Sequence, residues 1–108
     1  MSLINQKPDY SIADGNHNFD AQQIDSNNAM IQVDYTDLEA EDVTLSLEQA
    51  ISPGASFTQV PESLVTVNPA KTSHSWNLTG VARGIYIRVA LTKGTAAAGT
   101  IDRISYLY

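Results

Sequence analysis

Apolar and polar residues alternate most clearly between Gly84 and Thr92. The apolar members of this stretch are Ile85, Ile87, Val89 and Leu91. Single, more polar residues separate them, so one face of an extended chain would be apolar and the other polar. This period of two predicts a β-strand with one face against a core.

Shorter stretches with the same pattern occur along most of the chain. The expected strands cover residues 16–24, 29–36, 43–48, 57–60, 64–67, 76–79, 85–92 and 100–108. Turn-forming residues separate them, for example the Asp-Ser-Asn-Asn run at 25–28 and the Ser-Pro-Gly-Ala run at 52–55. No segment of ten or more residues has a helical period. We therefore expect an all-β fold: a single antiparallel β-sandwich of about seven or eight short strands, immunoglobulin-like or jelly-roll.

Two details of strand pattern give sharper expectations. Ile101 and Ile104 are three residues apart and cannot share one face of a regular strand, so a β-bulge is predicted near Asp102 and Arg103. In residues 16–24, Phe19, Ala21 and Gln23 are expected to share a face. Residues expected in the core are Ile31, Val33, Leu45, Leu47, Trp76, Ile85, Ile87 and Val89.

The length of 108 residues suits one domain. Residues 16–108 are expected to form the sandwich domain. Residues 1–15 are expected to form an N-terminal arm or an edge strand, because Pro8 and the Asp14-Gly15 pair interrupt their apolar positions. Such an arm would lie on its own sheet or on a neighbouring subunit, and deleting residues 2–12 would then leave a folded domain.

The composition of the chain argues against several classes of protein. There are no cysteines, which excludes disulfides and thiolate metal sites. The net charge of −6 comes without a visible basic patch, so nucleic acid is not an expected partner. No apolar run approaches the ~20 residues that a membrane-spanning helix needs.

Catalysis is not expected from the two histidines. His74 lies between Ser73 and Ser75, but neighbours on a strand point to opposite faces. A Ser-His-acid triad needs side chains that converge in space. We therefore assign no catalytic residues and expect a protein that is not an enzyme.

Calcium is the one metal with candidate ligands. Residues 14–20 include Asp14, Asn16, Asn18 and Asp20, and the acidic run of Glu39, Glu41 and Asp42 could add further oxygens. The spacing that ends a calcium loop on a bidentate glutamate is missing. Two solvated turns explain these residues more simply, and we expect neither a metal nor a cofactor.

The aromatic residues allow two interpretations. Trp76 could stack on a sugar ring, yet it shares its face with Leu78 beside the most apolar strand, which favours a core position. Tyr106 and Tyr108 could form a strip at a subunit contact or simply complete a strand. Asn77-Leu78-Thr79 matches the N-glycosylation pattern.

The order of several short motifs resembles that of small β-sandwich modules, immunoglobulin-like or jelly-roll-like, in bacteriophage virion structural proteins. The matching segments are IQVDYTDL at 31–38, VTLSLEQA at 43–50, SFTQVP at 56–61, SHSWNLT at 73–79, IYIRV at 85–89, KGT at 93–95 and AGTI at 98–101. The chain departs from these modules at 52–55, where they usually carry an Asp-Gly-Thr turn. The resemblance implies a small structural subunit and carries over no catalytic residue.

The expected function is therefore that of a non-enzymatic structural protein located in a bacteriophage virion, as a capsid decoration, vertex, spike-base or tail component. Its expected partners are copies of itself and other virion proteins. The alternative is a carbohydrate- or receptor-binding β-sandwich module, with a host-surface glycan as the ligand. A third possibility, a small inhibitor or interaction domain, has no residue in its favour.

Overall fold

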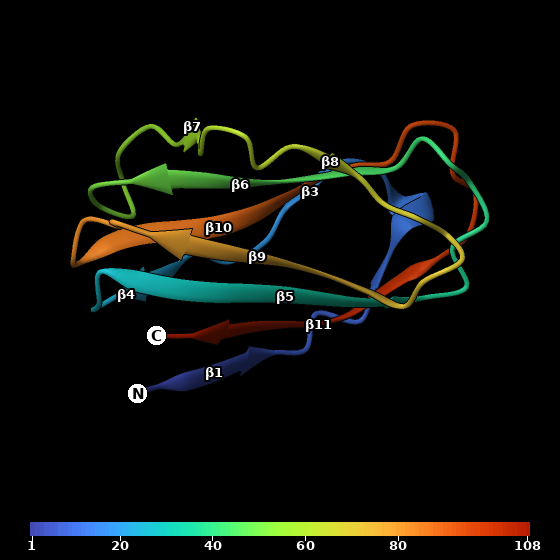
Figure 1. Ribbon diagram of the computed structural model, residues 1–108. Coiled ribbons are helices and arrows are strands. Elements are labelled where there is room, and N and C mark those ends of the chain that lie inside the picture. Colours follow the sequence, from blue (N-terminus) through green and yellow to red (C-terminus); the bar gives the residue numbers. More distant parts are fainter.

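Two antiparallel β-sheets pack face to face in the computed structural model, which describes residues 1–108 (Figure 1). The strands are β1 (Leu3–Gln6), β2 (Tyr10–Ser11), β3 (His17–Asn18), β4 (Gln22–Ile24), β5 (Asn28–Thr36), β6 (Thr44–Ala50), β7 (Thr58–Gln59), β8 (Val65–Thr66), β9 (Ser73–Thr79), β10 (Ile85–Thr92) and β11 (Thr100–Leu107). One 3₁₀ turn covers Ile12–Asp14. The predicted all-β sandwich is confirmed.

The strand order is that of a jelly roll. Sheet A has the order β1-β11-β5-β9, and sheet B has the order β3-β10-β6-β7. The short segments β2, β4 and β8 pair with the same strands as β1, β3 and β7, so each pair of segments is one broken strand. Counted in this way, the eight strands lie in the orders 1-8-3-6 and 2-7-4-5, which decides between the two predicted architectures.

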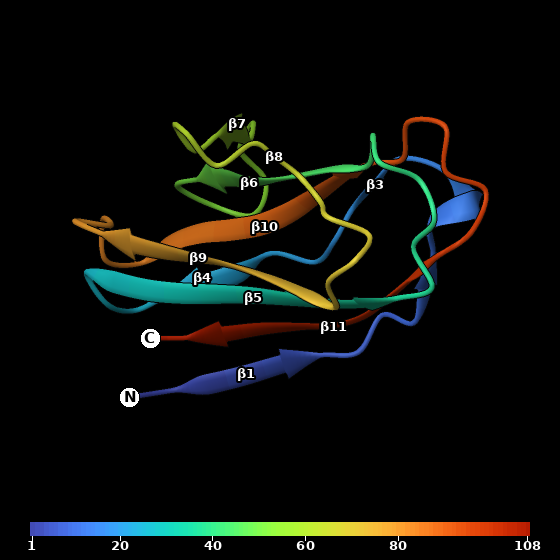
Figure 2. The same ribbon diagram turned by 45° about the vertical axis from the view of Figure 1, so that its right-hand side comes forward.

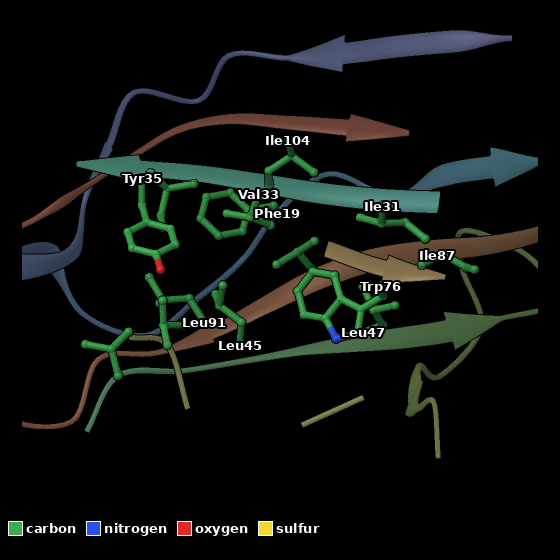
Figure 3. Packing of buried hydrophobic residues seen from close by; sticks show 14 of the residues in the cluster. Phe19, Ile31, Val33, Tyr35, Leu45, Leu47, Trp76, Ile87, Leu91 and Ile104 are labelled. Carbon is green, nitrogen blue, oxygen red and sulfur yellow. The ribbon is translucent and has the colours of Figure 1, made fainter. Parts of the chain in front are cut away.

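The core lies between the sheets and follows the period-two pattern. Ile31, Val33 and Tyr35 alternate along β5 and are buried, while the residues between them are partly exposed. Leu45 and Leu47 from β6 and Ile87 from β10 face them across the sandwich (Figure 3). Of the eight expected core residues, seven are buried; Ile85, at the first position of β10, is only partly buried.

The predicted irregularity in the last strand is confirmed. The pairing of β11 with β5 shifts between Ile101 and Arg103, opposite Tyr35 and Asp34. The extra residue, Asp102, lets both Ile101 and Ile104 turn into the core.

The prediction of one strand over residues 16–24 is wrong. Phe19 and Ile24 are both buried but differ in parity, and Gln23 is exposed. A continuous strand would place these two apolar side chains on opposite faces. The chain therefore leaves the ladder after Phe19, whose N–H still donates to the Val89 carbonyl, and resumes as β4.

Residues 1–15 lie on the chain's own sheet A. β1 pairs with β11 along its whole length and forms the outer strand of the sheet, beside the C-terminus (Figure 2). β2 continues the pairing beyond the bulge. Ile12 follows in the 3₁₀ turn and is fully buried, so the end of this segment contributes to the core. The structure contains no helix that could span a membrane.

Candidate functional site

A row of apolar side chains crosses the outer face of sheet A. Strand pairing places Leu3 of β1 opposite Leu107 of β11, and Leu107 opposite Met30 of β5. Residues directly opposite in an antiparallel sheet share a face and lie about 5 Å apart. Leu3 is 61% exposed, and Met30 and Leu107 are partly exposed, so this apolar row faces solvent.

The apolar row borders a broad groove, called here the terminal groove. This terminal groove has a volume of about 690 Å³ and lies beside both chain ends. Its lining residues are Met1, Ser2, Asp25, Ser26, Asn28, Ala29, Met30, Asn77, Leu78, Thr79, Leu107 and Tyr108. Half of these residues are hydrophobic, and only Asp25 carries a charged side chain. Such a surface suits an apolar contact from another protein rather than a charged small molecule.

The rest of this outer face is polar, and a smaller hollow of about 280 Å³ spans it and the apolar row. The next row, moving along the strands, contains Asn5, Ser105, Gln32 and Ser75. Beyond it, the Arg103 guanidinium lies 3.0 Å from the Asp34 carboxylate. Both charges of this pair are partly exposed to water, so the face carries no strong field of either sign.

A second, polar groove lies on the outer face of sheet B. It has a volume of about 440 Å³ and is lined by Asn16, His17, Asn18, Ser46, Glu48, Gln59, Leu64, Ala90, Leu91 and Thr92. The sheet brings these residues together because β3 and β6 pair with opposite sides of β10. Amide, hydroxyl and carboxylate groups offer both donors and acceptors to a ligand with many hydroxyls.

Glu48 in this polar groove is held in place by its neighbours. Its carboxylate accepts a hydrogen bond from Arg88 Nε at 2.7 Å, across the β6–β10 pairing. The Arg88 guanidinium in turn lies 4.0 Å from the centre of the Phe57 ring. The ion pair and the cation–π contact fix the position of one wall of the groove.

His74 lies against Trp76 and away from both serines beside it. The two rings meet edge to face at a centroid distance of 4.7 Å. Burial, and secondarily the charge of Lys71, lower the pKa of His74 below its ordinary value. Ser73 and Ser75 lie opposite Asp34 and Gln32 and are exposed on the outer face. β9 thus directs the His74 side chain to one face of the sheet and the Ser73 and Ser75 side chains to the other.

The Asp14–Asp20 segment is organised by packing and by turn hydrogen bonds. His17 stacks on Tyr10 with the ring centres 4.4 Å apart, and Tyr10 donates its hydroxyl hydrogen to the Gly15 carbonyl at 2.8 Å. Asn16 Oδ1 accepts the Lys93 N–H at 3.0 Å. No three His, Asp or Glu side chains gather closely enough to hold a metal ion.

Of the acidic run, Asp42 has a structural partner. Its two carboxylate oxygens accept the N–H and the hydroxyl of Thr95, both at 2.9 Å. The Asp42 side chain lies so close to Gly94 that a β-carbon there would come within 2.6 Å of it. Asp42 therefore caps the 93–95 turn, and its carboxylate is occupied by that turn.

Trp76 is a core residue, as predicted. It is 7% exposed, and its indole N–H donates to the Ser63 carbonyl at 2.9 Å. Tyr106 also points into the core, whereas Tyr108 lies at the terminal groove and accepts a hydrogen bond from Gln22 Nε2 at 3.0 Å. Asn77 is exposed on β9.

Sequence reasoning missed the apolar row formed by Leu3, Met30 and Leu107. Each of these residues occupies the outward position of its strand, where a polar residue is the norm for a half-buried sheet. In each strand, the sequence therefore shows an apolar residue at a position where the side chain points away from the core. Whether these residues form one surface depends on strand pairing, because only the order β1-β11-β5 brings the three side chains together.

Comparison with known proteins leaves the family open. No protein-family model matches the chain, and no curated protein sequence matches it. These comparisons do not link the chain to the virion proteins that its motifs resemble.

Proposed function

We propose that the chain is a non-enzymatic structural protein of a bacteriophage virion that acts through contacts with copies of itself and with other virion proteins. The apolar row of Leu3, Met30 and Leu107, together with the terminal groove beside it, carries this proposal. A contiguous apolar surface on a small domain is typical of a protein–protein contact.

Two further observations support the virion as the location. The order of the sequence motifs resembles that of phage virion modules, and the jelly-roll fold is common in viral capsid domains. The second observation is an analogy of fold, which hosts many functions, lectins among them. Both histidines pack against aromatic rings, His17 against Tyr10 and His74 against Trp76, and these contacts fit a structural role for the two side chains.

The contact surface can be tested with a matched pair of lysine substitutions. Met30 and Gln32 lie on the same strand and the same outer face, one row apart, and both are partly exposed. Met30→Lys should reduce the size of the assemblies that the concentrated protein forms, whereas Gln32→Lys should leave their size unchanged. Sedimentation velocity and electron microscopy would measure the assemblies. Equal behaviour of the two variants would remove the apolar row from the proposal.

The location needs a separate experiment. Phage particles grown from a genome that encodes the chain should contain it in a fixed ratio to the other structural proteins. Quantitative mass spectrometry of gradient-purified particles would measure that ratio. A chain that remains in the host lysate and is missing from purified particles is not a virion protein.

Glycan binding is a second candidate function, and the polar groove on sheet B favours it. Asn18, Glu48 and Gln59 present amide and carboxylate groups there, and Arg88 holds Glu48 in place. Calorimetry with soluble host glycans should detect binding that Asn18→Ala weakens. Asn77→Ala, an exposed asparagine on the other sheet, serves as the control. An absence of heat with every glycan tested would remove this candidate.

A further inference from the structure

β9 is the one long strand with an unpaired edge. It pairs with β5 along Ser73–Thr79 and with no other strand. The Tyr35 N–H donates to the Thr72 carbonyl. This bond shows which residues of β9 form backbone hydrogen bonds with β5, because such residues alternate along an antiparallel pair. Even-numbered residues of β9 thus bond to β5, and odd-numbered ones direct their N–H and C=O groups outward. Ser73, Ser75, Asn77 and Thr79 make no other backbone hydrogen bond, so these groups are free to pair.

The other three edges of the sandwich are interrupted in ways that discourage pairing. β1 has four residues and runs into Lys7 and Pro8. The β3–β4 edge is broken after Phe19, and the β7–β8 edge is broken around Pro61. Short strands, prolines and lysines are the usual protection of exposed sheet edges. β9, with seven residues and no proline, lacks all of it.

β9 is also free of charge, although the chain has a net charge of −6. No Asp, Glu, Lys or Arg occurs between Ser73 and Thr79. Two copies that approach along this edge avoid the repulsion that their other surfaces would cause. The edge offers hydroxyl and amide side chains on the outer face, which form favourable pairs with one another across antiparallel strands.

We propose that two copies of the chain associate by antiparallel pairing of β9 with β9 of the second copy. This inference rests on the proposed function as a subunit that contacts copies of itself, and it names the edge through which they join. Figure 2 shows β9 beside β5, on the side away from β11, so the pairing would extend sheet A of one copy into sheet A of the other.

The register follows from the strand itself. A two-fold axis at Trp76 places Ser75 opposite Asn77 of the second copy and Ser73 opposite its Thr79. All four residues direct their backbone groups outward, so every outward N–H and C=O of one strand meets a partner on the other. Trp76 and its counterpart then occupy a position without hydrogen bonds, with both indoles directed into their own cores.

The experiment compares two substitutions at one residue. Ser75→Pro removes an outward N–H and leaves the pairing with β5 intact, whereas Ser75→Ala keeps that N–H and removes only the hydroxyl. Sedimentation equilibrium, at concentrations below those at which larger assemblies form, should show a dimer for the intact chain and for Ser75→Ala, and a monomer for Ser75→Pro. Trp76 fluorescence, which reports on the core, verifies that each variant is folded.

Amide hydrogen exchange of the unmodified chain tests the same idea without a substitution. The Ser75 and Asn77 amides should exchange about tenfold more slowly in concentrated than in dilute solution, because pairing protects them. Three results would each overturn the proposal. The intact chain could be a monomer at all concentrations, or folded Ser75→Pro could still form the dimer. The exchange rates of these amides could also be the same in dilute and concentrated solution. Detection of the chain in phage particles despite such a result would leave the proposed function standing.

Discussion

Ser63 fills the gap where β6 loses its neighbouring strand. β7 pairs with Glu48 and Gln49, and β8 pairs with Thr44 and Leu45, so the residues between them have no strand partner on that side. Ser63 Oγ accepts the Leu47 N–H at 3.0 Å and donates to the Val60 carbonyl at 2.7 Å. Its carbonyl accepts the Trp76 indole N–H from the other sheet. One small buried residue thus connects the two sheets.

Ser63→Ala should reduce the free energy of unfolding by about 1–3 kcal/mol, because it leaves the buried Leu47 N–H without an acceptor. Urea unfolding followed by Trp76 fluorescence would measure the loss. Ser56→Ala, at an exposed serine in the same half of the chain, is the matched control and should change stability little. Equal effects from both variants would contradict the role of Ser63.

Tyr106 presents the opposite case, because its buried hydroxyl has no hydrogen-bond partner. Burial, and secondarily the charge of Asp20, raise the pKa of Tyr106 far above its ordinary value. Tyr106→Phe should therefore stabilise the fold by about 1 kcal/mol. Tyr35→Phe is the control: its hydroxyl donates to the Asn68 carbonyl at 2.8 Å, and its loss should destabilise. A less stable Tyr106→Phe would mean that a buried water bonds this hydroxyl.

His74 should make stability depend on pH. Its pKa in the folded state is lowered below the ordinary 6.5, so below that pH the unfolded chain binds more protons than the folded one. Stability is therefore complete above about pH 6.5 and falls as the pH decreases toward the folded-state pKa. Thermal unfolding from pH 8 to pH 5 should show this decrease in stability. His74→Gln should remove the part of the decrease that comes from His74. A variant with the wild-type pH profile would exclude His74 as the cause.

At the scale of elements, β11 is the strand on which sheet A is built. It pairs with β5 on one side and with β1 and β2 on the other, and its bulge falls between the two halves of that second pairing. The chain ends are joined by paired hydrogen bonds between Ser2 and Tyr108. Because β1 covers the outer side of β11, the C-terminal strand is internal, and the outer edge of sheet A belongs to β1.

The buried position of Ile12 changes the expectation that residues 2–12 can be deleted from a folded domain. Deleting residues 2–6 removes only β1 and should leave a cooperative, weaker fold. Ile12→Ala alone should cost about 2–5 kcal/mol, because it opens a cavity in the core. Calorimetry would compare the stability of the 2–6 deletion with that of Ile12→Ala. Ala13→Gly, at the exposed neighbouring position, serves as a control that should change stability little. A full-length Ile12→Ala protein of wild-type stability would contradict this assignment.

At the scale of the molecule, stability comes from one core enclosed by two sheets. Twenty buried hydrophobic residues form a single cluster that draws on both sheets. A domain of about this size buries roughly two-thirds of its unfolded surface, which is enough for a fold without disulfides. The jelly-roll order also distributes pairing partners across the whole chain, because each terminal segment joins a strand from the other half.

The fold should therefore be independent of metal ions. Thermal unfolding with and without a chelator should give the same Tm, because the acidic turns are held by hydrogen bonds to backbone and hydroxyl groups. Added calcium should likewise leave the Tm unchanged. A Tm that rises with calcium concentration would point back to residues 14–20 and to Asp42.

The class of fold and most of the core could be predicted from the residue pattern alone. Alternation along residues 29–36, 43–48 and 85–92 placed the buried face of each long strand, and the three-residue spacing of Ile101 and Ile104 located the bulge. The shared parity of Trp76 and Leu78 indicated a core tryptophan. All of these are local properties, because the side-chain direction in a strand depends only on its position along that strand.

The choice of neighbouring strands, and the side chains that these strands bring together on the outer faces, could not be predicted from the residue pattern. The break after Phe19 and the role of Ser63 arise from partners far away in sequence, Val89 and Leu47. The apolar row of Leu3, Met30 and Leu107 exists because three distant strands pair in one register, and the edge of β9 is free because no strand follows it in the sheet. Alternation specifies a face but not a neighbour, so pairing depends on how the whole chain closes its core.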